Sequence, residues 1–127
     1  MHVLDRLTAT RVVATPAALD AAVWPPRAIV LRVAPDEVIA LATIDASSIG
    51  DPHAIVELDT SFHGVWIPTT DALAWLEREC DWEWPADRPS FAQGAVAGLA
   101  VKIWFETDRV LFVVAAPFAS DFAERCR

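Results

Sequence analysis

The chain has 127 residues, 54% of them hydrophobic, and a formal net charge of −8 at pH 7. A chain of this length buries one core, and with Lys102 as its single lysine it has no basic stripe to follow a nucleic-acid backbone. Its longest unbroken apolar run, Val110–Ala116, is seven residues, whereas a membrane-spanning helix needs about 20. We therefore expect neither nucleic-acid binding nor membrane insertion. Because residues 1–13 lack the apolar core of a signal peptide, we predict a cytoplasmic protein.

Residues 1–27 differ in pattern from the rest, and we interpret them as an N-terminal arm. Thr15 followed by Pro16 is typical of a helix start, because a threonine oxygen caps the first turn and proline suits the first helical position. Pro25 and Pro26 end whatever precedes them. We predict a helical turn or two over residues 16–23 on an otherwise extended arm, of a kind that a partner often orders.

The segment 28–44 can be interpreted in two ways. Pro35 followed by two acidic residues suits a helix start, but Pro35 is equally suited to the second position of a type I turn. β-Branched residues are frequent on both sides of this proline, which favours strands. We predict a β-hairpin here, followed by a loop over residues 45–52, which are rich in turn-forming residues.

From His53 onward the pattern alternates between strands and helices. We predict strands over residues 53–59, 62–67, 99–106 and 109–115, helices over 70–80 and 118–126, and a loop between 81 and 98. The odd-numbered residues from Leu99 to Phe105 are apolar, which predicts one buried and one mostly solvated face. The strand 109–115 is apolar on both faces and is predicted to be central. The expected architecture is a single α+β domain over 28–127, in which two or three helices pack on one face of an antiparallel sheet.

Residue types that carry chemistry do not converge in this sequence. His2, His53 and His63 share no metal-ligand spacing, the glycines are scattered, and no serine lies in a nucleophile elbow. We therefore predict no catalytic, cofactor-binding or metal-binding residue. Cys80 and Cys126 each close a predicted helix, and we expect two buried thiols, with a disulfide between them as the alternative.

Aromatic residues are the strongest candidates for a binding role. Trp82 and Trp84 follow the helix predicted over 70–80 in an extended stretch, where they would project side by side. Either both rings fold back over the sheet edge as core, or they anchor a partner, since tryptophan is enriched in both settings. For a partner interface we predict Trp82 and Trp84 together with Phe62 and Trp24. For Asp59, which joins two strands, a turn-capping role is preferred over a ligand-binding one.

Five segments carry a resemblance to a known family. They are VLRVAPDEVIAL (30–41), ELDTSFHGVWI (57–67), DALAWLERECDWEWP (71–85), PSFAQGAVAGLAVKIWF (89–105) and APFASDFAERC (116–126). In order and local pattern they resemble the gamma subunit of heterotetrameric sarcosine oxidase, a group related to the folate-binding fold of the glycine-cleavage T-protein. The resemblance implies a T-protein-like or ferredoxin-like βαβ-type sandwich.

The chain also departs from that family at three places. The loop at 45–52 is shorter than the helical insert usual there, and Thr69 stands where glycine is common. Relatives that bind folate carry an aspartate near the strand that corresponds to residues 98–106, and here no acid lies between Gly98 and Lys102. The resemblance therefore extends to the fold more than to a ligand site.

The resemblance implies that this chain has a role in assembling a larger complex. The leading hypothesis is a non-catalytic, gamma-like small subunit of a sarcosine oxidase-type flavoenzyme, with flavin and folate held by a larger flavoprotein partner and no cofactor in this chain. The alternative is a stand-alone T-protein-like module that holds folate or another flat heterocycle against Trp66 or Trp104. A homo-oligomeric α+β domain of unrelated purpose is the third hypothesis.

Overall fold

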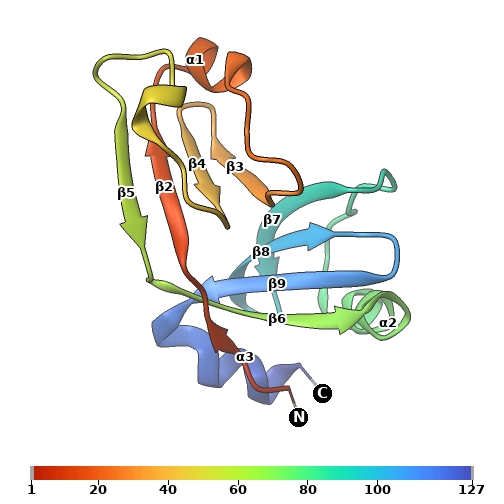
Figure 1. Ribbon diagram of the computed structural model, residues 1–127. Coiled ribbons are helices and arrows are strands. Elements are labelled where there is room, and N and C mark those ends of the chain that lie inside the picture. Colours follow the sequence, from red (N-terminus) through yellow and green to blue (C-terminus); the bar gives the residue numbers. More distant parts are fainter. Residues whose placement is uncertain (1, 127) are drawn as a thin grey trace. The chain divides into compact units, whose positions relative to one another are not determined.

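The computed structural model describes residues 2–126 and is an α+β protein with two antiparallel sheets (Figure 1). The described part of the chain contains nine strands, three α-helices and two short 3-10 helices. The chain divides into two compact units. Unit 1 consists of residues 1–6 and 61–127, and unit 2 is the continuous stretch Leu7–Thr60.

Unit 2 is built on a four-stranded sheet with the order β3-β4-β2-β5. Its elements are β2 (Ala9–Val13), α1 (Pro16–Ala21), β3 (Val30–Ala34), β4 (Glu37–Ala40), η1 (Ala46–Ser48) and β5 (Ile55–Asp59). Strands β3 and β4 form the predicted hairpin, with Leu31 opposite Ile39. Its core gathers small and medium-sized side chains, among them Val12, Leu19 and Val38.

The expected N-terminal arm contains more regular structure than predicted. Its helix is confirmed as α1, in which the Thr15 hydroxyl accepts a hydrogen bond from the Ala18 amide at 3.2 Å. The preceding residues are not a free extended segment, because Ala9–Val13 pairs with β4 on one side and with β5 on the other. This double pairing satisfies the backbone polar groups of β2 and buries Val12 completely.

Unit 1 is built on a five-stranded sheet with the order β1-β6-β9-β8-β7. The strands are β1 (Asp5–Arg6), β6 (Phe62–Pro68), β7 (Ser90–Val96), β8 (Leu99–Phe105) and β9 (Arg109–Ala115). Strand β9 is central, as predicted. The odd-numbered residues of β8 from Leu99 to Phe105 are all buried, which confirms the predicted alternation.

Helices α2 (Thr69–Glu79) and α3 (Ala119–Arg125) cover one face of this sheet, and η2 (Ala116–Phe118) leads into α3. Trp75 of α2 is 4% exposed, and its ring meets the edges of Phe112 and Phe122 with centroids 5.4 Å apart in each pair. The Trp75 indole also donates a hydrogen bond to the Arg125 carbonyl oxygen at 3.0 Å. One side chain of α2 therefore joins both helices to the sheet.

Two features of the predicted architecture are wrong. The strands form two sheets instead of one, because β5 pairs with β2 whereas β6 pairs with β9 and β1. Helix α1 belongs to unit 2, so only α2 and α3 of the three helices pack on one sheet face, which is the lower of the two predicted numbers. In addition, residues 90–96 form strand β7 where a loop was predicted. Within residues 2–126, no helix has the length and apolar character needed to cross a membrane.

Candidate functional site

The segment that leaves α2 holds the indole of Trp82 in one position. The Cys80 thiol donates to the Trp82 carbonyl oxygen at 3.3 Å, and Trp82 Nε1 donates to the Ala95 carbonyl oxygen of β7 at 2.9 Å. The ring lies so close to Gly94 that a Cβ atom there would be 2.9 Å from both Cε2 and Nε1 of Trp82. Glycine at position 94 is therefore what lets the indole rest on the sheet.

Trp82 and Trp84 border a cavity of about 360 Å³. Both side chains are half-buried and pack against the core of unit 1. The cavity is lined by these two residues together with Glu77, Cys80, Asp81 and Glu83. The two rings thus contribute to the core and also form part of a concave surface, so the two sequence interpretations of this pair are not exclusive.

The electrostatic character of this cavity is acidic. Glu77, Asp81 and Glu83 are exposed, and no basic side chain lines the cavity. Within residues 2–126 the salt bridges involve other carboxylates, those of Asp20, Glu37, Glu57 and Glu106. Arg88, the next basic residue along the chain, lies over the Phe105 ring at 4.9 Å and donates to the Pro85 carbonyl oxygen. The residues that line the cavity therefore include two tryptophans and three acidic residues whose carboxylates are in none of these salt bridges.

The other two predicted interface residues, Phe62 and Trp24, are not among those that line this cavity. In β6, Val65 and Ile67 pack toward the helices, so Phe62 lies on the opposite face of the sheet, because side chains alternate along a strand. There the Lys102 ammonium lies 5.3 Å from the centre of the Phe62 ring. Trp24 packs against the core of unit 2. Phe62 therefore does not share a surface with the Trp82–Trp84 cavity.

Trp66 and Trp104, the candidates for stacking a flat heterocycle, are engaged within the molecule. They occur opposite the same residue of β9, Leu111. The Arg109 guanidinium lies 3.7 Å from the centre of the Trp66 ring and donates through Nε to Glu106 at 2.9 Å. The other carboxylate oxygen of Glu106 accepts from Trp104 Nε1 at 3.1 Å. A heterocycle on the arginine-covered face of Trp66 would have to displace Arg109.

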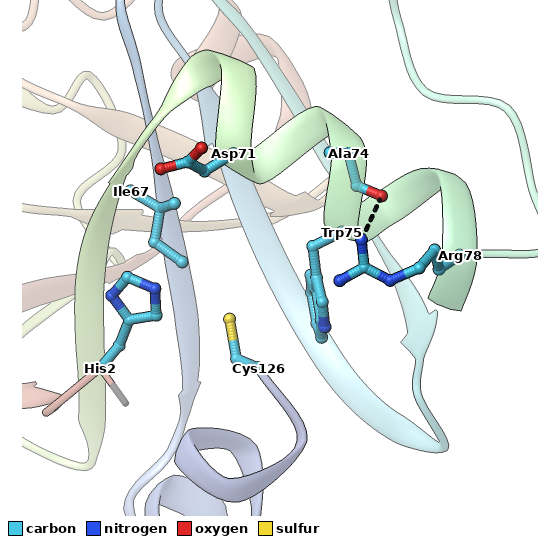
Figure 2. Close-up of a pocket in the computed structure, with 7 residues that line it drawn as sticks. All are labelled: His2, Ile67, Asp71, Ala74, Trp75, Arg78 and Cys126. Carbon is cyan, nitrogen blue, oxygen red and sulfur yellow. Dashed lines mark hydrogen bonds between the residues drawn. The ribbon is translucent and has the colours of Figure 1, made fainter.

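A second cavity, of about 320 Å³, lies beside α2 (Figure 2). Figure 2 shows Cys126 between His2 and Trp75, with Asp71 and Arg78 on the first and last turns of α2. Burial raises the pKa of the Cys126 thiol to about 11. The thiol is therefore protonated at neutral pH and is a poor nucleophile, because the thiolate is the reactive form. The presence of a histidine nearby does not make this a Cys–His nucleophilic pair.

Both cysteines are free thiols, as predicted, although Cys80 is only half-buried. Among the described residues, no group of three or more histidine, cysteine, aspartate or glutamate side chains is placed to hold a metal ion. The close packing of the Trp82 ring on Gly94 was not predicted. Nor was the acidic lining, although the alternation of acid and tryptophan from Asp81 to Trp84 is visible in the sequence.

The fold defines an α+β protein with two antiparallel sheets and three short helices. No family model, curated protein or solved structure matches the chain.

Proposed function

We propose that this chain is a non-catalytic small subunit that docks on a larger protein through the surface around Trp82 and Trp84. The observation that carries the proposal is the pair of half-buried indoles, one of them fixed on β7, at the rim of a cavity. Tryptophans held in place before binding lose little side-chain freedom on association and are typical anchors of interfaces.

The sequence resemblance supports a specific identity for the complex. We propose a heteromeric sarcosine oxidase-type flavoenzyme in which this chain is the gamma-like subunit, with an assembly role, while flavin and folate reside in the larger partner. The two-sheet α+β fold would then be a variant of the T-protein-like fold group. Support comes from the five family-like segments, which include DALAWLERECDWEWP with the tryptophan pair.

The test is co-expression with a large flavoprotein subunit of sarcosine oxidase type from the same genome. We expect a stable complex in size-exclusion chromatography with light scattering, and flavin absorbance only in fractions that contain the large subunit. A chain that stays at 13.9 kDa beside that partner contradicts the proposal, and a multiple of this mass without the partner indicates a homo-oligomer.

Mutations then assign the surface. Because both rings contact the core, weaker binding by Trp84→Ala could come from a less stable chain and not from a lost contact with the partner. A second variant, Glu83→Arg, therefore changes the same surface without removing either ring. We expect Trp84→Ala to weaken the complex by about 2 kcal/mol or more, roughly 30-fold. Phe118→Ala is the matched control, because Phe118 is an exposed aromatic residue of unit 1 outside this cavity. Equal affinity of all three variants for the partner would show that the docking surface lies elsewhere.

A further inference from the structure

We infer that the cavity beside Trp82 and Trp84 receives a guanidinium group, the side chain of an arginine on the partner. That this arginine belongs to a partner protein rests on the proposed function. The chemistry of the group rests on the cavity itself, which has a volume of about 360 Å³ and is lined by two tryptophans and three acidic residues. That volume lies at the lower end of the range for ligand pockets, about 300–1,000 Å³, and suits one long side chain.

The aromatic part of the cavity is rigid before anything binds. Trp82 is held by its hydrogen bond to Ala95 and cannot move closer to β7, because Cε2 and Nε1 already lie against Gly94. Its single N–H donor is used in that bond, so the indole has only its π surface to offer a ligand. A cation over an indole is attracted by the ring quadrupole, and more strongly so when the ring is already in place.

The carboxylates determine the sign of the ligand. Glu77 comes from the last turns of α2, and Asp81 and Glu83 flank Trp82 in the chain. With no basic residue in the lining, an anion would be repelled and a cation would neutralise charge that is unpaired in this structure. Charge and indole surface therefore select the same class of ligand, an organic cation.

One arginine of this molecule already shows how a guanidinium interacts with an indole and a carboxylate at the same time. On the other face of the unit 1 sheet, Arg109 stacks on Trp66 at 3.7 Å while its Nε donates to Glu106 at 2.9 Å. The Trp82–Trp84 cavity presents the same two components, indole and carboxylate, without the arginine. A planar guanidinium can stack and donate to carboxylates at once, whereas an ammonium is a more strongly hydrated point charge. Arginine is therefore the expected occupant.

The test uses the whole chain labelled with ¹⁵N and the peptide Ac-Gly-Arg-Gly-NH₂ as the probe. The chain has six tryptophans, so its indole N–H signals can be assigned with single Trp→Phe variants. We expect the Trp82 and Trp84 signals to shift with a dissociation constant in the millimolar range, and the shifts to shrink in high salt. The matched citrulline peptide, which has the same shape and no charge, should leave these signals unmoved.

Variants separate the site from general attraction to an acidic protein. Glu83→Gln should weaken peptide binding about threefold or more, while Glu124→Gln, which removes one exposed carboxylate on α3, should leave it unchanged. Trp84→Leu should abolish the shift of Trp82. If Trp84→Leu does not fold, which the dispersion of its spectrum reports, the two glutamine variants still decide the outcome.

Several results would overturn the inference. Equal shifts with the citrulline peptide, no shift of Trp82 or Trp84, or equal weakening by both glutamine variants would each exclude a guanidinium site here. Tighter binding of the lysine peptide or of tetramethylammonium would replace arginine with an ammonium ligand. If the flavoprotein complex forms but the peptide does not bind, the inference fails and the proposed function stands. If the peptide binds but no such complex forms, the flavoprotein partner is excluded and the guanidinium site stands.

Discussion

The two units of this protein are stabilised by different kinds of interaction. Unit 1 is held by large aromatic side chains, with Trp75, Phe112 and Phe122 in mutual contact under two helices. Unit 2 has a core of smaller aliphatic side chains, and polar interactions connect its strands and loops. One of these is Arg11 of β2, which forms salt bridges to Glu37 at 2.9 Å and to Glu57 at 3.0 Å.

A second polar connection in unit 2 runs through aspartates. Asp51 accepts hydrogen bonds from the backbone amides of His53 and Thr15, at 2.9 and 3.0 Å, and thereby ties the start of α1 to the loop before β5. Asp45 caps η1 through the amide of Ser47. These bonds lower the pKa of both carboxyl groups. Apolar burial is nearly independent of pH, whereas these links are not, so the two units should respond differently to mutation and to acid.

The largest expected effect is the loss of the Trp75 ring. Trp75→Ala removes a buried indole and its hydrogen bond to Arg125, and should lower the free energy of unfolding by about 3–5 kcal/mol. Urea denaturation followed by circular dichroism measures this. Trp75→Phe is the control, because it keeps a ring between Phe112 and Phe122 and should cost clearly less. Similar losses for both variants would mean that the aromatic cluster is not the main support of unit 1.

The corresponding truncation in unit 2 should cost less. Leu19 is 2% exposed, and Leu19→Ala should lower the free energy of unfolding by about 2–3 kcal/mol, because it removes fewer buried atoms than the loss of an indole. Hydrogen exchange monitored by NMR should show the loss of protection concentrated in residues 7–60. Equal loss across β6, β8 and β9 would show that the two units unfold as one.

A glycine in each unit gives a paired test of packing. Gly94→Ala would place a Cβ 2.9 Å from the Trp82 indole and should destabilise the protein by about 1–3 kcal/mol while moving the Trp82 indole N–H signal. Gly50→Ala, at a position with no atom within 4 Å of the new Cβ, should change stability very little. An unchanged Trp82 signal in Gly94→Ala would contradict the seating of the indole on β7.

In alkali, unit 1 should be the sensitive one. The pKa of Cys126 is raised in the folded state to about 11, from an ordinary value of 9.0, so its contribution to stability is full below pH 9 and is lost as the pH rises toward 11. We expect a loss of about 1 kcal/mol between about pH 8.5 and 10. The chain has no tyrosine to complicate this range. Cys126→Ala should flatten the profile and Cys80→Ala should not, whereas an unaltered profile in both would exclude Cys126 as its cause.

The smallest expected effect concerns acid and unit 2. The lowered pKa of Asp51 means that its stabilising contribution is present above the ordinary aspartate value of 3.8 and is lost as the pH falls through the folded value. Asp51→Asn should slightly lower the thermal midpoint at neutral pH and reduce the acid dependence below pH 4. Asp108→Asn in unit 1 is the control. Identical acid profiles in the two variants would remove the proposed link between Asp51 and acid sensitivity.

Elements with strong alternation could be predicted from sequence, and those with small inward-facing residues could not. Strand β8 is evident from Leu99, Val101 and Ile103, which all face the core. Strand β7 was missed because two of the three residues opposite them are small, with Gly94 paired to Val101 and Ala92 to Ile103. The space above Gly94 is filled by Trp82, which comes from outside the strand. No local pattern within residues 90–96 could reveal that.

Strand pairing was harder still to predict. The strands before and after Thr60 follow one another closely, which favoured a shared sheet, yet each pairs with a distant segment. Trp82 and Trp84, which line the cavity, could be singled out because tryptophan in an extended stretch is visible in the sequence, and their role in an interface stays a prediction. The position of Phe62 on the opposite face from Trp82 could not be predicted, since it depends on the register of β6, β8, β9 and β7.

The interrupted course of unit 1 has a consequence for folding during synthesis. Unit 2 is one continuous stretch and can complete its four-stranded sheet once residue 60 has left the ribosome. Strand β1 emerges before unit 2, but it pairs with His63 and Gly64 of β6, so it must wait until the whole of unit 2 has been made. Strand β6 in turn pairs with β9, which ends at Ala115. The unit that carries the aromatic cavity is therefore closed last, by contacts between segments far apart in the chain, which are the slow ones to form.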